Sequence, residues 1–168
     1  VYKRQEYGNY CSDMTRTVPV NGKFTPRQRA VYESVLNMMT YAKKILRPGI
    51  LKSEYERLVR VFAAGELVKL GLITPSQVAE KPSDPPIVRK YYMHGCSHFL
   101  GLDVHDVGEA NPVVLPGMVF TVEPGIYIAE EGIGIRLEND VLIGETENID
   151  LLGDVPLLPD DIERLMAR

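Results

Sequence analysis

The chain has 168 residues, of which 45% are hydrophobic and 25% charged, as in an ordinary globular domain. Its net charge of −4 argues against a nucleic-acid backbone as the main partner, because such partners favour basic surfaces. The sequence holds no apolar run as long as a membrane span, and its two cysteines are too few for a disulfide framework. We therefore expect a cytoplasmic protein that binds neither nucleic acid nor a membrane.

The beginning of the chain is unusual. Residues 1–5 have no strand or helix pattern, which indicates a fragment or a start that is foreign to the natural protein. Residues 6–20 are rich in Tyr, Thr and Val and predict one or two strands that end at the turn Asn21-Gly22. Asp13 is unexpected in such a stretch, because aspartate is depleted in strands. A turn between short strands and a ligand that points into a site explain Asp13 equally well.

Two helices are predicted next. The first begins at Thr25-Pro26-Arg27-Gln28, where Thr25 and Gln28 form a capping box, and it ends at Arg47-Pro48-Gly49. The second runs from about Ser53 to Leu70, and Ser53 and Glu56 have the spacing of another capping box. The positions with helical spacing that we expect in the core are Val31, Val35, Leu36, Met39, Ala42 and Ile45 in the first helix, and Leu58, Val61, Leu67 and Leu70 in the second.

A proline-rich connection follows at residues 72–90, with room for one short helical turn. All three histidines then lie within residues 93–108, namely His94, His98 and His105. Histidine suits metal ligation and proton transfer near neutral pH, and core histidines would be scattered along the chain. A metal or acid–base site explains this cluster better than a solvated loop.

The last third of the chain predicts strands with polar residues set into them. Met118 to Val122 looks like a buried strand, and Glu123 follows at its end, where a carboxylate is costly unless it is paired or coordinated. Residues 132–143 predict another strand, in which Arg136 and Glu138 face the same side. They form either a salt-bridged pair on a solvent face or part of a polar site. Residues 144–159 predict a turn and a short strand, followed by a helix that Asp160 or Asp161 caps.

The candidate metal ligands are Asp13, His98, Glu123 and Glu138, one from each of four separate segments. An oxygen-rich site with one imidazole suits Mn²⁺, Co²⁺ or Zn²⁺. Cysteine ligation is disfavoured because the sequence has no Cys-x-x-Cys spacing. A serine triad is disfavoured too, because Ser97 lies in no Gly-x-Ser-x-Gly motif.

Four blocks of sequence carry a family resemblance. They lie at residues 6–17, 94–106, 121–125 and 134–140, and they hold Asp13, His98, Glu123 and Glu138 in that order. Together they resemble the catalytic domain of Xaa-Pro aminopeptidases, in the pita-bread metallopeptidase family shared with prolidase and methionine aminopeptidase. The resemblance implies an α+β pita-bread (creatinase/aminopeptidase) fold. Residues 6–168 would form a C-terminal partial catalytic domain of a longer parent.

The resemblance also implies the chemistry of the site. Two divalent ions, Mn²⁺ before Co²⁺ or Zn²⁺, would activate water to hydrolyse the bond before a penultimate proline. Asp13, His98, Glu123 and Glu138 match four of five family ligands, and the fifth falls at Tyr2, which cannot replace a carboxylate. The remaining roles implied are catalysis for His94, His105 and Glu123, and substrate binding for His94, His105, Tyr127 and Arg136.

Two alternatives remain beside the aminopeptidase. Prolidase, the dipeptide-specific relative, is less similar around residues 15–24. A non-catalytic pita-bread binding module would have lost metal ligands, whereas four of them remain here. The expected partners are peptides with proline at the second position, and the full-length parent is expected to be a homo-oligomer. With one ligand missing, the isolated chain is expected to have reduced activity or none.

Overall fold

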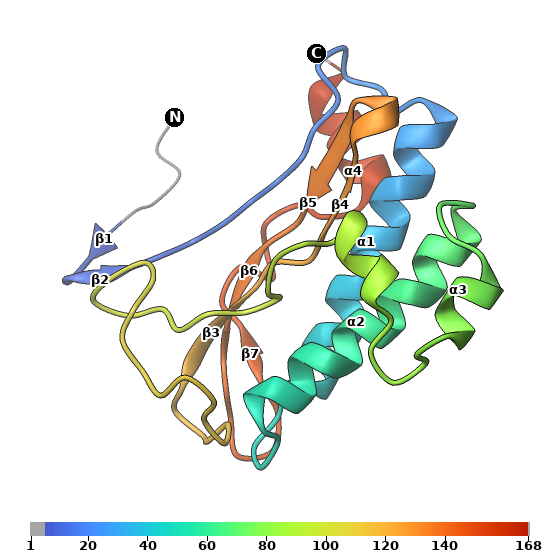
Figure 1. The fold of residues 1–168 in the computed structure, drawn as a ribbon. Helices are drawn as coiled ribbons and strands as arrows, with labels where there is room; N and C mark the ends of the chain where they lie inside the picture. The colour runs from blue at the N-terminus through green and yellow to red at the C-terminus, as the bar shows by residue number, and fades with distance from the viewer. Residues whose placement is uncertain (1–5, 168) are drawn as a thin grey trace.

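The computed structural model describes residues 6–167, so the predictions for residues 1–5, Tyr2 included, lie outside the described residues. Figure 1 shows two long helices against a bent sheet, with a hairpin and loops on the opposite side. The elements are β1 (Glu6–Tyr7), β2 (Tyr10–Cys11), α1 (Pro26–Ile45), α2 (Lys52–Lys69), α3 (Pro75–Ala79), a 3₁₀ turn (Pro86–Lys90), β3 (Val119–Val122), β4 (Gly125–Ile128), a second 3₁₀ turn (Ala129–Glu131), β5 (Ile133–Arg136), β6 (Asn139–Leu142), β7 (Ile149–Asp150) and α4 (Pro159–Met166).

The centre of the sheet is one long antiparallel hairpin that is interrupted halfway. β4 pairs with β5 near the turn, and β3 pairs with β6 farther from it. Val122 pairs with Asn139 and Gly125 with Arg136, so the register continues across the break without a slip. β7 pairs with the outer edge of β6. The interruption therefore lies at residues 123–124 on one strand and 137–138 on the other.

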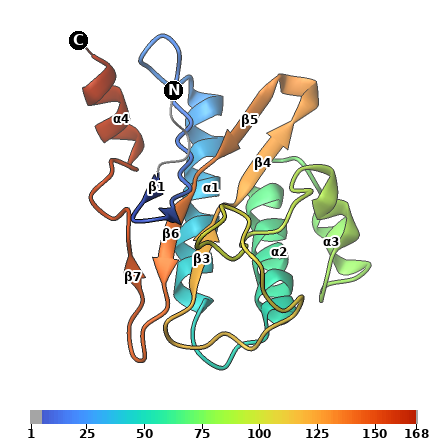
Figure 2. The same ribbon diagram turned by 90° about the vertical axis from the view of Figure 1, so that its left-hand side faces the viewer.

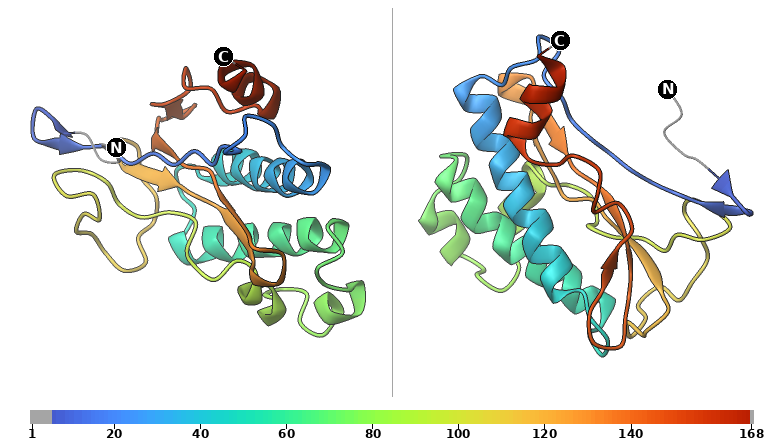
Figure 3. Two further views of the ribbon diagram at one scale, coloured as in Figure 1. Left: turned by 90° about the horizontal axis from the view of Figure 1, so that it is seen from above. Right: turned by 180° about the vertical axis from the view of Figure 1, so that it is seen from behind.

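The helices α1 and α2 cover one face of this sheet. They lie side by side, whereas residues 91–118 and the β1–β2 hairpin lie on the other face (Figures 2 and 3). α1 begins with the predicted capping box, in which Thr25 Oγ1 accepts the Gln28 N–H and Gln28 Oε1 accepts the Thr25 N–H. Met38 and Met39 are fully buried between the layers. The predicted apolar face of α1 is confirmed, with Leu36 only partly buried.

The prediction for α2 is right in extent but wrong in its cap and in part of its face. The helix begins at Lys52, and Asn111 Oδ1 accepts the Ser53 N–H, so Ser53 and Glu56 form no capping box. The residues that face the core are Tyr55, Val59, Ala63, Ala64 and Leu67, whereas Leu58, Val61 and Leu70 are only partly buried. The sequence pattern was misleading because the sheet side of α2 holds small and aromatic residues.

The strand predictions miss two features of the hairpin. Residues 132–143 form β5 and β6, not one strand, because the ladder breaks at Leu137 and Glu138. The strand β3 ends at Val122 as predicted, but pairing resumes after Pro124 in β4, which was not predicted. Both errors arise because a polar break inside a strand pair has no simple period in the sequence.

Shorter elements agree more closely. One or two strands were predicted in residues 6–20, and two short ones form, but they end at Cys11 and not at the turn Asn21-Gly22. Residues 12–20 have no regular pairing except a bridge between Thr15 and Glu138. Residues 72–90 contain α3 and a 3₁₀ turn, and β7 and α4 lie where predicted. Asp160 and Asp161 lie in the first turn of α4 instead of capping it. Among residues 6–167, no helix combines the length and the apolar character that crossing a membrane requires.

Asp150, at the end of β7, ties α1 to the sheet. Its carboxylate accepts hydrogen bonds from Lys43 Nζ at 2.8 Å and from Asn139 Nδ2 at 2.8 Å. Burial raises the pKa of Asp150, but the hydrogen bonds from Lys43, Asn139 and the Leu152 N–H outweigh it and hold the pKa below its ordinary value. A carboxyl group of this kind stabilises the fold above its unfolded pKa of about 3.9, and this contribution is lost as the pH falls through the lower folded pKa.

Asp150→Asn is therefore expected to lower the melting temperature at about pH 7 and to matter progressively less below about pH 4. Thermal unfolding of both proteins across this range measures the difference. A difference that stays constant with pH would contradict the assignment of the effect to the charge of Asp150.

Candidate metal centre

Four extended segments lie side by side at the break in the hairpin. Residues 13–17 lie along one side of residues 136–140, where the Glu138 N–H donates to Thr15 O at 3.0 Å. Residues 96–100 lie along residues 119–123 on the other side. There the Glu123 N–H donates to Cys96 O at 2.8 Å, and the Thr121 N–H donates to His98 O at 3.1 Å. Each segment supplies one candidate ligand, so backbone hydrogen bonds bring Asp13, Glu138, Glu123 and His98 together.

The two glutamates face each other across the break. The continuous register places Glu123 opposite Glu138. At the next opposed pair, the Leu137 N–H donates to Pro124 O at 3.3 Å. Like charges directly opposite on paired strands are destabilising. Burial raises the pKa of Glu123 to about 7, and the charge of Glu138 adds to the increase. A cation or a proton between the two carboxylates would relieve this repulsion.

His98 presents one nitrogen to the carboxylates. Its Nδ1 lies 2.8 Å from Phe99 O, which can only accept, so Nδ1 carries the proton and Nε2 has the lone pair. Nε2 lies 3.6 Å from Glu123 Oε1 and 3.8 Å from Asp13 Oδ2, and it has no hydrogen-bond partner among the described residues. A hydrogen bond to a backbone carbonyl is the usual way to orient a metal-binding histidine.

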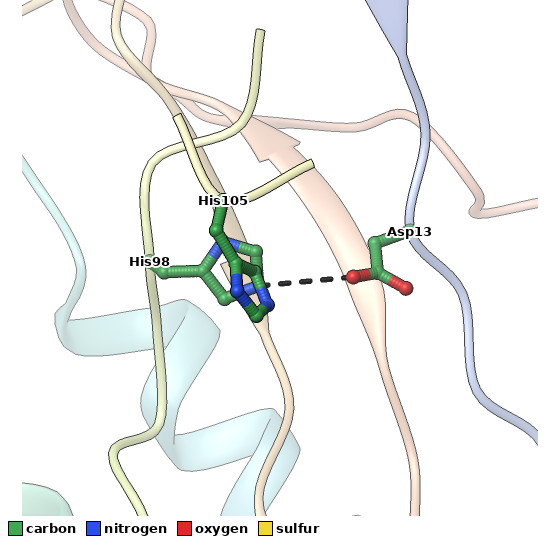
Figure 4. Close-up of side chains that lie close together, drawn as sticks. All are labelled: Asp13, His98 and His105. Atoms are coloured by element: carbon green, nitrogen blue, oxygen red, sulfur yellow. Dashed lines mark ion pairs between the residues drawn. The ribbon is translucent and has the colours of Figure 1, made fainter. Parts of the chain in front are cut away.

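Asp13 joins this cluster from the N-terminal segment. Its carboxylate points toward His98, as Figure 4 shows, while its backbone N–H donates to Asp140 Oδ2 at 3.1 Å. Asp140 is itself buried, and burial is the main cause that raises its pKa to about 7. The extended position of Asp13 favours the site explanation over the turn explanation.

Thr15 and Arg136 complete the polar wall. Arg136 Nε lies 3.3 Å from Thr15 Oγ1 and 3.9 Å from Glu123 Oε2, and Thr15 Oγ1 donates to Glu138 Oε2 at 2.5 Å. Arg136 and Glu138 thus face the same side, as expected, and that side is a polar site rather than open solvent.

The other two histidines lie around the same cavity, which has a volume of about 520 Å³. His94 Nδ1 donates to Gly95 O, and its Nε2 accepts the Tyr127 hydroxyl at 2.8 Å. Burial lowers the pKa of His94, which favours this neutral ring. The exposed His105 ring packs edge-on against His98, with centroids 4.4 Å apart, and lies beside His98 in Figure 4.

The donor atoms fit a divalent metal ion. Nε2 of His98 is an acceptor, and the carboxylate oxygens around it are acceptors too, so none of them can satisfy another without a proton or a cation. The groups Asp13, His98, His105 and His98, Glu123, Glu138 each bring three ligand atoms within 4.8 Å of one another. Metal–ligand bonds of about 2.0–2.2 Å place neighbouring donors about 3–4 Å apart, which agrees with the distances around His98.

Three polar residues near the centre were not among the predicted site residues. Thr15 bonds Glu138, Asp140 accepts from the Asp13 N–H, and Glu56 on α2 accepts from the Cys96 N–H. Thr15 and Asp140 lie inside the sequence blocks that carry the resemblance, which was a usable signal. For Glu56, its spacing from Ser53 indicated a cap instead.

The cysteines allow a direct test of the buried side of this centre. Cys96 is fully buried, and burial raises the pKa of its thiol to about 12, whereas Cys11 is partly exposed. A thiolate is the reactive form, so Cys96 should resist alkylation while Cys11 reacts. We expect one fast thiol in the folded chain and a second only after denaturation, as measured with a chromogenic disulfide reagent. Two fast thiols would contradict this packing.

Comparison with known proteins adds independent information. The model of metallopeptidase family M24 matches residues 5–145. The chain is 44% identical to the Xaa-Pro aminopeptidase of Escherichia coli, over 96% of this chain and 39% of that protein. It is 41% identical to the Xaa-Pro aminopeptidase of Haemophilus influenzae, over 96% of this chain and 40% of that protein. The chain therefore spans about two fifths of the length of these relatives.

Solved structures agree with the sequence comparison. Proline aminopeptidase P II from Yersinia pestis superposes with a TM-score of 0.86 at 44% identity, over 96% of this chain and 40% of that one. A zinc-substituted aminopeptidase P of E. coli in complex with product gives a TM-score of 0.86 at 42% identity, over 96% of this chain and 39% of that one.

Proposed function

Because the chain belongs to metallopeptidase family M24, we propose that its histidine and carboxylate cluster is the metal centre of a Xaa-Pro aminopeptidase. The fold is the α+β pita-bread fold that the sequence predicted, since the matching solved structures are aminopeptidases P. We propose both the peptide bond that this chain hydrolyses and the ions that it uses.

The observation that carries the proposal is the arrangement around the break in the hairpin. Glu123 and Glu138 stand opposite each other, and the free lone pair of His98 Nε2 points toward Glu123 and Asp13. A fold that only needed stability would not place acceptors against acceptors, because buried charges are costly without a partner.

We assign metal ligation to Asp13, His98, Glu123 and Glu138. These four residues would hold the metal ions, as the resemblance implies. A bound divalent ion would lower the pKa of water and polarise the scissile carbonyl. The fifth family position, Tyr2, lies outside the described residues.

The other residues of the cavity handle the peptide and its protons. His94 is held neutral between Gly95 O and the Tyr127 hydroxyl, so it can accept or pass a hydrogen bond at Nε2. His105 is exposed at the rim, where it can meet a substrate. Arg136 stands beside Glu123 and can orient that carboxylate or bind peptide oxygen. Glu123 is assigned a role in proton movement in addition to ligation.

We also propose the ion, the substrate and the cellular compartment. Mn²⁺ is the first choice, with Co²⁺ or Zn²⁺ as substitutes, since an oxygen-rich site with one imidazole accepts all three. The substrates are peptides with proline at the second position. The free thiols of Cys11 and Cys96 support a reducing, cytoplasmic setting. We also propose that the full-length protein assembles as a homo-oligomer.

Metal content and peptide hydrolysis test the proposal together. The purified chain is loaded with Mn²⁺, desalted and analysed for metal per chain, and then assayed with a Xaa-Pro-Xaa tripeptide beside the matched Xaa-Ala-Xaa tripeptide. We expect bound Mn²⁺ and, if activity is present, cleavage of the proline peptide only. Two ions per chain would show that the site is complete without a carboxylate at residue 2, and one ion would show that it is not.

Two further outcomes separate the alternatives. Cleavage of a Xaa-Pro dipeptide but not of the tripeptide would identify a prolidase. Absence of any bound Mn²⁺, Co²⁺ or Zn²⁺ would contradict the metal centre and leave a binding module.

A further inference from the structure

The loop that carries His94 and His98 is held from behind by helix α2. Glu56 extends from α2, and its Oε2 accepts the Cys96 N–H at 2.8 Å while its Oε1 accepts the Ser97 N–H at 3.2 Å. Glu56 and Cys96 are both buried, and the two residues are 40 positions apart in the chain. One carboxylate therefore satisfies two successive backbone donors of this loop.

Several neighbours make this contact specific. Lys52, one turn earlier on α2, places Nζ 3.2 Å from Glu56 Oε1 and so supplies the counter-charge. A Cβ at Gly95 would lie in van der Waals contact with Glu56 Oε1, at 3.4 Å, so the loop backbone packs directly against this carboxylate. Tyr55, also on α2, places its hydroxyl 2.9 Å from Ser97 Oγ.

The same loop peptides lead directly to two candidate metal ligands. Cys96 donates its N–H to Glu56, and its carbonyl accepts a hydrogen bond from the Glu123 N–H at 2.8 Å. His98 follows two residues later and is fixed to Thr121 through its own N–H and carbonyl. The position of the Cys96 peptide thus influences both Glu123 and His98.

We propose that Glu56 is a positioning residue for the metal centre, which it serves by fixing the Cys96–Ser97 backbone that sets His98 and Glu123. This proposal rests on the proposed function for its metal readout, but not for the loop contact itself. Glu56 bonds the loop backbone, and apart from its charge, which adds to the raised pKa of Glu123, its effect passes through this loop.

The structure offers a closely matched control. Glu66 lies on the same helix, is equally buried, and is also paired with a lysine, because Lys69 Nζ lies 2.6 Å from its Oε1. Its other contact is Asn37 on α1, at 3.3 Å, which is away from the histidine loop. Glu56→Gln and Glu66→Gln therefore make the same chemical change at two buried sites of α2, and only the first touches the loop.

The first readout needs no metal. Alkylation of Cys96, followed by peptide mass mapping, reports opening of the loop in the metal-free chain. Glu56→Gln keeps the size of the side chain but replaces one acceptor by a donor that faces a backbone N–H. We expect the Cys96 labelling rate to rise about 10- to 100-fold in Glu56→Gln, as for loss of a charged hydrogen bond, and to stay within about threefold of wild type in Glu66→Gln.

The second readout is the affinity for Co²⁺, followed through its visible absorption spectrum. We expect Glu56→Gln to weaken binding about 10- to 100-fold and Glu66→Gln to leave it nearly unchanged, as is typical for residues that orient ligands. Equal labelling rates in the two variants would overturn the proposal. So would equal Co²⁺ affinities of the two variants when the wild type binds Co²⁺. A wild type that binds no Co²⁺ would instead refute the proposed function, and the labelling rates would still decide the role of Glu56.

Discussion

His98→Ala is expected to weaken divalent-metal binding at least about 100-fold, because even residues that only orient ligands typically contribute 10- to 100-fold. The structure gives the reason for so large an effect. His98 Nε2 belongs to both groups of ligand atoms, the one with Asp13 and the one with Glu123 and Glu138. Without this imidazole, the second group is reduced to two carboxylates, and the first keeps only Asp13 and the exposed His105. Any turnover of a Xaa-Pro peptide that the wild-type chain shows should fall below detection.

Calorimetric titration with Mn²⁺ measures the affinity, and thermal unfolding with and without Mn²⁺ gives a second measure. A 100-fold loss of affinity removes about 2.7 kcal/mol of metal-dependent stabilisation at saturating metal. His94→Ala is the matched control, since it removes a histidine from the same loop whose ring contacts Gly95 O and Tyr127 rather than the carboxylates.

The control should keep its metal affinity within about threefold and lose any turnover that the wild-type chain shows, because His94 faces the cavity but belongs to neither ligand group. Equal loss of metal affinity in the two variants would refute the distinction between a ligand and a substrate-facing histidine.

The contrast between these histidines was open to prediction from the sequence only in part. Clustering showed that the segment mattered, and family blocks assigned the roles. What the sequence alone could not show is which nitrogen of each ring is free. That depends on the carbonyls of Gly95 and Phe99, and the loop that carries them is positioned by tertiary hydrogen bonds to residues 119–123.

The helices illustrate what local patterns can and cannot predict. α1 follows its capping box and its period because both act within a few residues of sequence. In α2 the same rule failed, since Glu56 accepts from the Cys96 N–H and not from its own helix end. Glu56 could have capped its own helix, but it instead accepts a hydrogen bond from a backbone N–H that lies 40 residues away in the chain.

The break in the hairpin is a second feature that local sequence patterns do not predict. A regular strand pair would extend from Val119 to Ile128 and from Ile133 to Leu142, whereas the sequence predicted one strand that ends at Val122 and another over residues 132–143. The polar residues at the break interrupt the ladder, yet the register is kept, so Glu123 meets Glu138. A sequence-based view sees each glutamate as an irregularity in its own strand, and only the pairing reveals that they oppose each other.

Arg16→Met is expected to lower the free energy of unfolding by about 3 kcal/mol, the largest effect on stability that we predict for a single polar residue. Arg16 joins the segment that carries Asp13 to the sheet behind it. Its guanidinium donates to Glu138 O at 2.7 Å, to Asn139 Oδ1 at 2.7 Å and to Pro156 O at 2.9 Å. Burial lowers the pKa of Arg16, which shows how far the group is removed from water.

Methionine keeps most of the length of the side chain but has no donor, so these acceptors lose their partner in a part-buried place. Hydrogen bonds to a charged group contribute about 1.5–3 kcal/mol, and unsatisfied acceptors add to the loss. Arg16→Lys keeps the charge without the planar fork and should recover less than half of the difference.

Urea unfolding followed by far-UV circular dichroism measures the change, since the chain contains no tryptophan. Arg164→Met is the control: the Arg164 side chain is 75% exposed and, within residues 6–167, pairs only with Asp161 on its own helix, so its replacement should cost less than about 1 kcal/mol. Because Arg16 holds the Asp13 segment against Glu138, Arg16→Met should also weaken Mn²⁺ binding, whereas Arg164→Met should not. Similar stabilities for the two variants would show that the Arg16 hydrogen bonds are replaced by water, and that Asp13 is held in place by Thr15 and Asp140 alone.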